Sequence, residues 1–123
     1  MAKKILIADD EPNIVTSLEF LMRQRGYETN VARDGEEALA AVESFGPDLI
    51  LLDVMLPRRD GFDVCQKLRA EGHNELKIVM VTAKGRDVEI EKGMAVGADA
   101  YVTKPFATGD LVERVAALLE GGP

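Results

Sequence analysis

Three acidic residues lie at the ends of two apolar runs and are the first candidates for chemistry in this sequence. The apolar run 49–52 ends on Asp53, and the run 5–8 ends on Asp9 and Asp10. Continuous apolar runs of this kind are typical of strands buried on both faces, and ligands of open α/β sheets bind where such strands end. We expect the three carboxylates to meet in one crevice, to hold a divalent cation and to make Asp53 a phosphate acceptor.

Helix capping is the competing explanation for the acidic pair. Asp is a preferred N-cap residue, and Pro12 suits the first turn of a helix, so Asp9 or Asp10 could cap that helix. Capping explains one acid but not a pair followed by Glu11. Clustered carboxylates raise one another's pKa unless a cation compensates, and hard oxygen ligands suit Mg²⁺. We therefore favour a metal site over capping alone.

Thr82 and Lys104 end two further predicted strands and are expected at the same edge of the sheet. A carboxylate can accept a phosphoryl group, and the transfer needs positive charge on the phosphoryl oxygens, which Mg²⁺ and a Lys ammonium supply. A Thr hydroxyl can donate a hydrogen bond to the bound group. Asp53 could instead accept hydrogen bonds from loop amides. Taken alone, Thr82 would be an ordinary strand residue and Lys104 an ordinary surface residue. Their combination with three acids favours a phosphoacceptor site.

Strand-like and helix-like segments alternate along the chain and give the expected scaffold. Strands are predicted at Lys4–Ala8, 27–31, 49–52, Lys77–Thr82 and Ala100–Thr103, and helices at 12–26, 34–46, 61–72, Val88–Val96 and Asp110–Leu119. The alternating segment 27–31 suits an edge strand, and the apolar runs suit central strands. The pattern predicts an α/β fold, a flavodoxin-like three-layer (βα)5 sandwich whose parallel five-stranded sheet has the order 2-1-3-4-5.

Composition restricts the function classes. At 123 residues the chain predicts a single domain over 1–123, and its net charge of −7 is the wrong sign for a nucleic-acid binder. No stretch approaches the roughly 18 apolar residues of a membrane span, and Met1 leads into a strand without a signal peptide. The single cysteine, Cys65, cannot form an internal disulfide. We expect a cytoplasmic protein without direct nucleic-acid or membrane partners.

The motifs resemble the receiver domain of bacterial two-component response regulators, of the chemotaxis-regulator type. The pair Asp9-Asp10 is similar to the acidic pair of that family, and Asp53 to its phosphorylated aspartate. Thr82-Ala83 resembles its switch position, and Lys104-Pro105-Phe106 its lysine motif. Residues 56–61 and 97–101 resemble the loop after the acceptor and the approach to the last strand, so the resemblance spans essentially the whole chain.

The resemblance implies a metal site and a phosphoryl site. Mg²⁺ (or Mn²⁺) would be bound by Asp10, Asp53 and the backbone carbonyl of Met55, with Asp9 acting mostly through water. Lys104 would pair with a phosphoryl oxygen, and the peptide bond between Lys104 and Pro105 would be cis, which proline permits.

The resemblance also implies partners and a switch. A sensor histidine kinase or phosphotransfer protein would donate the phosphoryl group from a phosphohistidine. Thr82 would then move toward it, and Tyr101 would turn from solvent into the space left. The face formed by the fourth helix, fifth strand and last helix would control an output domain or partner protein. The chain would be a signalling domain that catalyses only its own phosphoryl transfer and slow autodephosphorylation.

Two residues near the acceptor are expected to set the lifetime of the phosphorylated state. Met55 and Lys84 flank the predicted path along which water would attack the acyl phosphate. A long thioether side chain and a long ammonium side chain could shield that path. The hypothesis predicts that shortening either side chain accelerates dephosphorylation.

Several features remain open from the sequence. His73 is expected to be exposed and without a role, and Cys65 to be a core residue. Ile90, Ala95 and Ala100 stand where the winged-helix DNA-binding branch commonly has charged residues, so its dimer is in doubt, and Ile90 and Ala100 could form an apolar patch for a partner. A monomer, a phosphorylation-dependent dimer, a complete regulator and an excised receiver all remain possible.

Three other function classes compete with the phosphoacceptor. A metal-dependent phosphatase with an aspartyl-phosphate intermediate would need a second acid near Asp53, where Met55 stands. A flavin- or nucleotide-binding module would need a glycine- or hydroxyl-rich loop after the first strand, where the acids at 9–11 would repel phosphate. A degenerate receiver that acts only as a docking surface would lack signature residues, and all are present here.

Overall fold

The protein is a three-layer α/β sandwich in the computed structural model, which describes residues 2–83, 91–92 and 94–120. One parallel sheet has the order β2-β1-β3-β4-β5, which confirms the predicted topology. The strands are β1 (Lys4–Ala8), β2 (Glu28–Ala32), β3 (Leu49–Leu52), β4 (Lys77–Thr82) and β5 (Ala100–Thr103). Their carboxyl ends therefore meet at one edge of the sheet.

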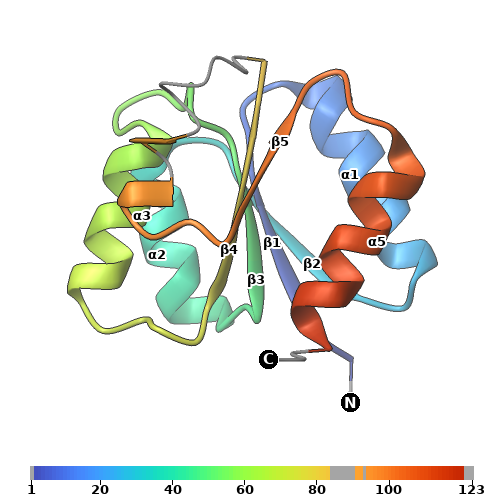
Figure 1. Ribbon diagram of the computed structural model, residues 1–123, viewed down its shortest axis with the longest axis horizontal. Coiled ribbons are helices and arrows are strands. Elements are labelled where there is room, and N and C mark those ends of the chain that lie inside the picture. Colours follow the sequence, from blue (N-terminus) through green and yellow to red (C-terminus); the bar gives the residue numbers. More distant parts are fainter. Residues whose placement is uncertain (1, 84–90, 93, 121–123) are drawn as a thin grey trace.

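Helices cover both faces of the sheet (Figure 1). Helices α1 (Pro12–Gln24) and α5 (Thr108–Leu119) lie on one face, and α2 (Gly35–Phe45) and α3 (Gly61–Ala70) on the other. The predicted helix Val88–Val96 falls partly outside the described residues, although 91–92 and 94–95 are helical. No helix among the described residues is long and apolar enough to cross a membrane.

Helix α5 begins at Thr108 rather than at the predicted Asp110. Asp110 is the third residue of the helix instead of its first. An acidic side chain is favourable at either place, because the exposed N–H groups and the helix dipole both attract negative charge there. The residue type alone therefore could not fix this boundary.

The apolar runs form the two cores that hold the layers together. Every residue of β3 is at most 1% exposed, whereas residues of β2 alternate between exposed and half-buried positions before Ala32, so β2 is an edge strand as predicted. Alternate strand residues face opposite sides. Leu6, Ile50 and Ile78 pack with α2 and α3, and their neighbours in the strands pack with α1 and α5. Burying both faces makes the strand ends a rigid frame.

Arg69, near the end of α3, fastens the opposite, amino-terminal edge of the sheet. Its guanidinium donates to the carbonyl oxygens of Gly97 (2.9 Å), His73 (2.6 Å) and Leu76 (2.7 Å) and to Oδ2 of Asp99 (2.9 Å). The same Asp99 oxygen accepts the backbone N–H of residue 78 at 2.7 Å. The planar guanidinium thus fixes α3 to the segments that enter β4 and β5.

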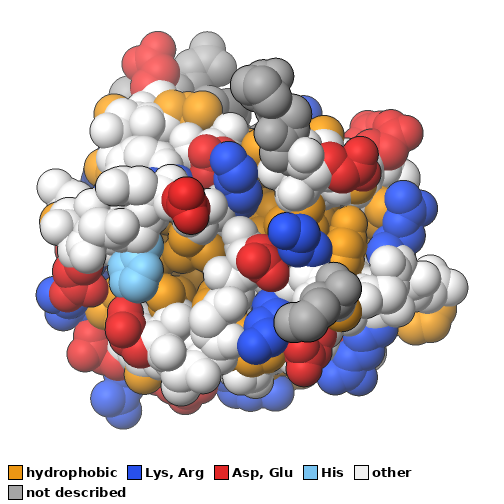
Figure 2. Space-filling model, turned by 90° about the horizontal axis from the view of Figure 1, so that it is seen from below, with side chains coloured by type: hydrophobic (Ala, Val, Ile, Leu, Met, Phe, Trp, Pro, Cys, Tyr) orange, Lys and Arg blue, Asp and Glu red, His pale blue; other side chains and the backbone are white. Residues whose placement is uncertain are grey.

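His73 is half-buried, not exposed as expected from the sequence. Its Nε2 lies 2.8 Å from Oε2 of Glu43, and its side chain is 29% exposed. Figure 2 shows the single histidine, in pale blue, on the face seen from below, the face opposite the ends of the strands that carry the acids. The sequence contains no sign of this contact, because Glu43 belongs to α2 and the two residues meet only when α2 packs beside α3.

Cys65 is a buried core residue, as expected. Its Sγ lies 3.5 Å from the carbonyl oxygen of Val96. Burial raises the pKa of the thiol to about 11, partly offset by the nearby positive charge of Arg69. Since the thiolate is the reactive form, Cys65 is not a nucleophile at neutral pH.

Gly61 is required by the close return of the chain to the end of β3. A Cβ at position 61 would collide with the backbone carbonyl oxygen of Asp53, and would lie 2.9 Å from the Cα of Val54. We expect Gly61→Ala to lower the free energy of unfolding by roughly 1–3 kcal/mol, the usual cost of forcing an extra carbon into a packed site. Urea denaturation measures this.

Gly109→Ala is the matched control. A Cβ there meets nothing within 4 Å, and the residue lies inside α5. Alanine should leave stability unchanged or raise it by up to about 1 kcal/mol, because it favours a helix more than glycine does. Equal effects of the two substitutions would show that the collision at position 61 is relieved without cost.

Candidate functional site

Asp9, Asp10 and Asp53 meet at the carboxyl edge of the sheet, as their positions after neighbouring strands predict. Strands β1 and β3 pair directly, so Ala8 lies opposite Leu52 and the acids follow side by side. One oxygen of each carboxylate lies within 4.8 Å of the others. Asp9 and Asp53 are 1% and 4% exposed, whereas Asp10 is exposed.

Backbone hydrogen bonds hold two of these acids as extensions of the strands. The N–H of Asp53 donates to the carbonyl oxygen of Ala8 at 2.9 Å, and that of Asp9 donates to Ala32 at 3.0 Å. One side-chain oxygen of each also accepts a nearby N–H: Asp9 Oδ1 from Glu11 at 2.9 Å, and Asp53 Oδ1 from Met55 at 3.1 Å. The orientation of both carboxylates is therefore set before any ligand binds.

The acidic pair does not cap α1 in the way the alternative interpretation required. The N-cap residue of α1 is Glu11, and its side chain makes no capping hydrogen bond. Asp9 accepts the N–H of that N-cap residue, one position outside the helix, and Pro12 takes up the first helical turn. Both acids consequently keep carboxylate oxygens available to the crevice.

Lys104 extends its ammonium into this group of carboxylates. Its Nζ lies 2.9 Å from Asp9 Oδ2, 3.2 Å from Glu11 Oε1 and 3.4 Å from Asp53 Oδ2. The side chain is only 9% exposed. The residue follows β5, and the peptide bond between Lys104 and Pro105 is cis. The structure thus brings together residues 95 positions apart in the sequence.

The electrostatic environment raises the pKa of both Asp53 and Lys104. Burial raises the pKa of the Asp53 carboxyl, as does the charge of Asp9, while the Met55 N–H and Lys104 partly oppose the increase. Burial acts to lower the pKa of Lys104, but its hydrogen bond to Asp9 and the charges of Asp53 and Asp9 raise it overall. One ammonium thus faces several carboxylates.

This donor set fits a divalent metal ion. Three carboxylates with oxygens this close repel one another, and a small cation relieves that repulsion better than one lysine can. Mg²⁺ binds oxygen ligands, commonly one or two carboxylates with several waters, and Mn²⁺ also suits carboxylate sites. The exposed Asp10 leaves one side of the group open to solvent.

A family model for the response regulator receiver domain matches residues 5–116, nearly the whole chain. The chain belongs to this family. The resemblance found in the sequence is thereby confirmed.

Solved receiver domains share the fold over almost their full length. The receiver domain of the Francisella response regulator 1452 is 32% identical, with a TM-score of 0.90, and 96% of this chain covers 97% of it. A CheY-like receiver domain protein from Methanospirillum hungatei is also 32% identical, with a TM-score of 0.91 and coverage of 98% and 95%. The BeF3-activated DrrB receiver domain is 32% identical, with a TM-score of 0.89 and coverage of 98% and 99%.

The other predicted site residues that the structure describes lie in β4, in β5 and shortly after Asp53. Thr82 is the last residue of β4, where its backbone pairs with that of Thr103. Tyr101 lies in β5, half-buried and packed against the core that faces α2 and α3. Met55 is 56% exposed beside Asp53. Lys84 lies outside the described residues.

One expectation for the output side is wrong. Ala100 was expected to contribute to an apolar patch, but it is only 7% exposed and packs in the core that faces α1 and α5. A small residue at the start of a strand gives no sequence signal for the face it occupies. Ile90, the other residue of that patch, lies outside the described residues.

The sequence did not predict the contacts of two charged residues, Glu11 and Arg59. Glu11 contacts Lys104, a pairing that follows only once the segments after β1 and β5 are known to lie at the same edge of the sheet. Arg59 joins the loop after β3 to α2 and α3, with Nε 2.8 Å from Glu36 and Nη1 3.1 Å from Asp63. A hydrogen bond to Glu36 raises the pKa of Arg59, against the opposing effect of burial.

The raised pKa of Asp53 predicts that the ionised side chain destabilises the metal-free fold. Folding favours the protonated form, so the free energy of unfolding falls as the pH rises through the unfolded and then the folded pKa. Asp53→Asn should therefore stabilise the protein in EDTA at pH 7 by about 1 kcal/mol, or about 4 °C in thermal midpoint. The gain should shrink as the pH falls and vanish below about pH 3, where the parent carboxyl is protonated in both states.

Glu75→Gln removes the same charge at an exposed position and should leave the midpoint nearly unchanged. Thermal unfolding followed by circular dichroism at several pH values compares the two. A lower midpoint for Asp53→Asn at pH 7 would contradict the electrostatic interpretation.

Proposed function

We propose that Asp53 is the phosphoacceptor of a two-component signalling system. The donor would be a phosphohistidine of a sensor histidine kinase or of a phosphotransfer protein. The observation that carries this proposal is the convergence of Asp9, Asp10, Asp53 and Lys104 at one edge of the sheet of a receiver domain. The relative DrrB, solved as a BeF3-activated receiver domain, supports the same assignment.

Mg²⁺, or Mn²⁺, is proposed as the cofactor of the reaction. Asp10, Asp53 and the backbone carbonyl of Met55 would hold it, with Asp9 acting mostly through water. When bound, the ion neutralises charge on the phosphoryl oxygens, so that an anionic donor can approach an acidic crevice. The proximity of the Asp9, Asp10 and Asp53 oxygens supports the carboxylate part of this ligand set.

The side chains of the protein orient the transfer. The Met55 N–H holds Oδ1 of Asp53, which fixes the plane of the nucleophilic carboxylate. An Asp53 oxygen attacks phosphorus, the bond between phosphorus and the imidazole nitrogen of the donor breaks, and an acyl phosphate forms on Asp53. Lys104 pairs with a phosphoryl oxygen, and Thr82 is proposed to donate a hydrogen bond to the same group.

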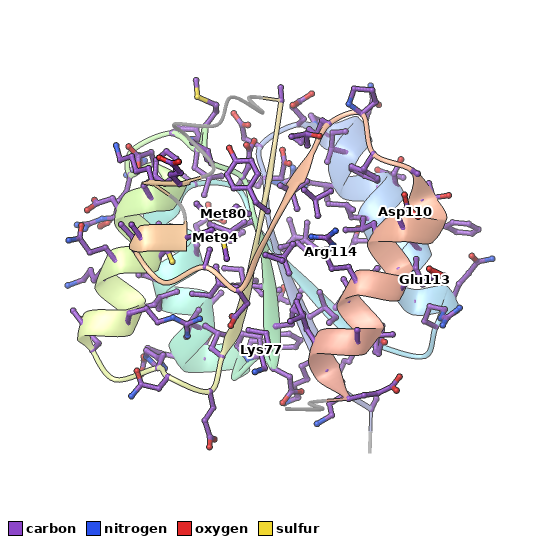
Figure 3. The ribbon with its side chains drawn as sticks, in the orientation of Figure 1. Lys77, Met80, Met94, Asp110, Glu113 and Arg114 are labelled. Atoms are coloured by element: carbon purple, nitrogen blue, oxygen red, sulfur yellow. The ribbon has the colours of Figure 1, made fainter. Side chains whose placement is uncertain are left out.

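The output is proposed to lie on the side of the molecule formed by the fourth helix, β5 and α5. A pocket of about 240 Å³ lies there, lined by Tyr101, Phe106, Asp110 and Arg114 among others. Figure 3 shows Arg114 extending from α5 toward β5. Conversion of a mostly inactive population into a mostly active one takes roughly 5 kcal/mol of differential binding. Contacts of the phosphoryl group with Mg²⁺, Lys104 and Thr82 are proposed to supply it.

The partners and the assembly follow from this role. An output domain or a separate protein would bind the face formed by the fourth helix, β5 and α5. Tyr101 is proposed to turn inward there when Thr82 moves toward the phosphoryl group. The chain would act as a monomer or as a phosphorylation-dependent dimer. The cytoplasmic location expected from the sequence stays a prediction.

Acetyl phosphate with Mg²⁺ tests the acceptor directly. We expect the protein to gain the mass of one phosphoryl group. It should not gain this mass in EDTA, which removes the metal ion, or as Asp53→Asn, which removes the proposed nucleophile. Intact-protein mass spectrometry measures the gain. Asp63→Asn, which changes an aspartate of α3 outside the crevice, should still be labelled. Labelling of Asp53→Asn at the parental level would assign the acceptor to another residue.

Met55 and Lys84 are proposed to slow hydrolysis of the acyl phosphate. The Met55 side chain is exposed beside Asp53, where it can obstruct water in line with the leaving oxygen. Met55→Asn and Lys84→Ala should therefore each shorten the lifetime of the phosphorylated state several-fold. Loss of label after removal of the donor measures the rate.

Met94→Asn is the control for the methionine substitution. Met94 is also an exposed methionine, 45% exposed, but it lies at mid-height beside α3 rather than at the strand ends (Figure 3). Its substitution should leave the decay rate unchanged. Decay rates of Met55→Asn and Lys84→Ala equal to that of the parent would reject the shielding hypothesis.

A further inference from the structure

The ammonium of Lys104 is fully engaged in the resting protein. A lysine ammonium has three N–H donors and no acceptor. Nζ lies 2.9 Å from an oxygen of Asp9, 3.2 Å from one of Glu11 and 3.4 Å from one of Asp53. The three donors thus have three carboxylate partners, and a phosphoryl oxygen can bind Lys104 only when one partner leaves.

Burial indicates which partner leaves. The side chains of Asp9 and Asp53 are 2% and 4% exposed, whereas that of Glu11 is 60% exposed. Separating a buried carboxylate from its cation leaves an uncompensated charge away from water, which is costly. An exposed carboxylate regains water when it leaves, so its ion pair is weak. Glu11 is therefore the partner that gives way.

The position of Glu11 in α1 leaves its side chain available for this contact. Glu11 is the N-cap residue of α1, a position that favours Ser, Thr, Asp and Asn because their short side chains bond to the first helical N–H groups. The Glu11 side chain makes no such bond. Its carboxylate instead reaches Lys104, which lies 93 positions away in the sequence.

We propose that Glu11 is a displaceable competitor for Lys104. In the resting state its carboxylate occupies the N–H donor that a phosphoryl oxygen takes after transfer. It thereby weakens binding of the phosphoryl group and sets how readily Asp53 is phosphorylated. This inference rests on the proposed function. Glu11 acts through Lys104 and does not touch the reacting atoms, so it is a positioning residue.

Two substitutions separate contact from charge. Glu11→Gln removes the charge and weakens the contact, whereas Glu11→Asp keeps the charge on a side chain one methylene too short to reach Lys104. Asp is also a good N-cap residue, so this variant should fold. We expect both variants to bind beryllofluoride in the presence of Mg²⁺ about two- to fivefold more tightly, the range given by an exposed ion pair.

Glu37→Gln is the matched control for net charge. Glu37 lies in the first turn of α2, at the same edge of the sheet, and its carboxylate accepts the N–H of Arg33 rather than contacting Lys104. The amide oxygen of Gln can accept the same hydrogen bond. This variant should bind beryllofluoride like the parent.

Isothermal titration calorimetry measures beryllofluoride binding. A second readout needs no ligand: in metal-free protein, the side-chain NH₃⁺ signal of Lys104 in ¹⁵N NMR spectra should shift in both Glu11 variants and not in Glu37→Gln. Tighter binding by both Glu11 variants with this shift supports the proposal. Tighter binding by Glu11→Gln but not by Glu11→Asp would overturn it in favour of a general charge effect.

The failure of this inference can be distinguished from failure of the proposed function. If the parent binds beryllofluoride and both Glu11 variants bind with the same Kd, Glu11 does not compete and only this inference is lost. If the parent binds neither beryllofluoride nor a phosphoryl group with Mg²⁺ present, the phosphoacceptor function fails, and the role of Glu11 fails with it.

Discussion

The ion cluster around Lys104 is the interaction on which the functional edge of this receiver domain depends. A single, almost buried ammonium lies within 3.4 Å of oxygens from Asp9, Glu11 and Asp53. It compensates part of the negative charge that the acids bring together, yet the pKa of Asp53 remains raised, chiefly by burial. The resting site is thus under electrostatic strain, which a divalent cation can relieve and which lysine alone does not.

The parallel sheet makes this cluster possible. In such a sheet every strand ends at the same edge, so acids after β1 and β3 and a lysine after β5 converge although they are far apart in sequence. Backbone hydrogen bonds continue past the strands to Asp9 and Asp53, and the close return at Gly61 fixes the loop that follows. The carboxylates are therefore positioned by the buried strands rather than by loop conformation.

The sequence predicted what depends on strand pattern and failed where side chains from distant elements meet. The strand order could be predicted from the apolar runs and from the alternating segment before Ala32. The convergence of Asp9, Asp10, Asp53 and Lys104 could be predicted because each follows a strand of the same parallel sheet. The Glu11 contact and the His73–Glu43 pair were missed because they depend on how helices and strands pack. Ala100 was assigned to the surface because alanine is compatible with both faces of a strand.

The two arginines on the α2 and α3 side bear on where a conformational switch can occur. Arg59 joins the loop after β3 to α2 and α3, and Arg69 fastens the far end of α3 to the segments before β4 and β5. Helix α3 is thereby anchored mainly at its carboxyl end by Arg69, which is only 18% exposed, and Lys92 also lies over the ring of Phe62, 4.7 Å from its centroid. A two-state change requires an element with two arrangements of similar free energy. A multiply anchored α3 is poorly suited to that, whereas the pocket between β5 and α5 offers space for side chains to rearrange. This contrast supports the proposed output face on physical grounds that are independent of the family resemblance.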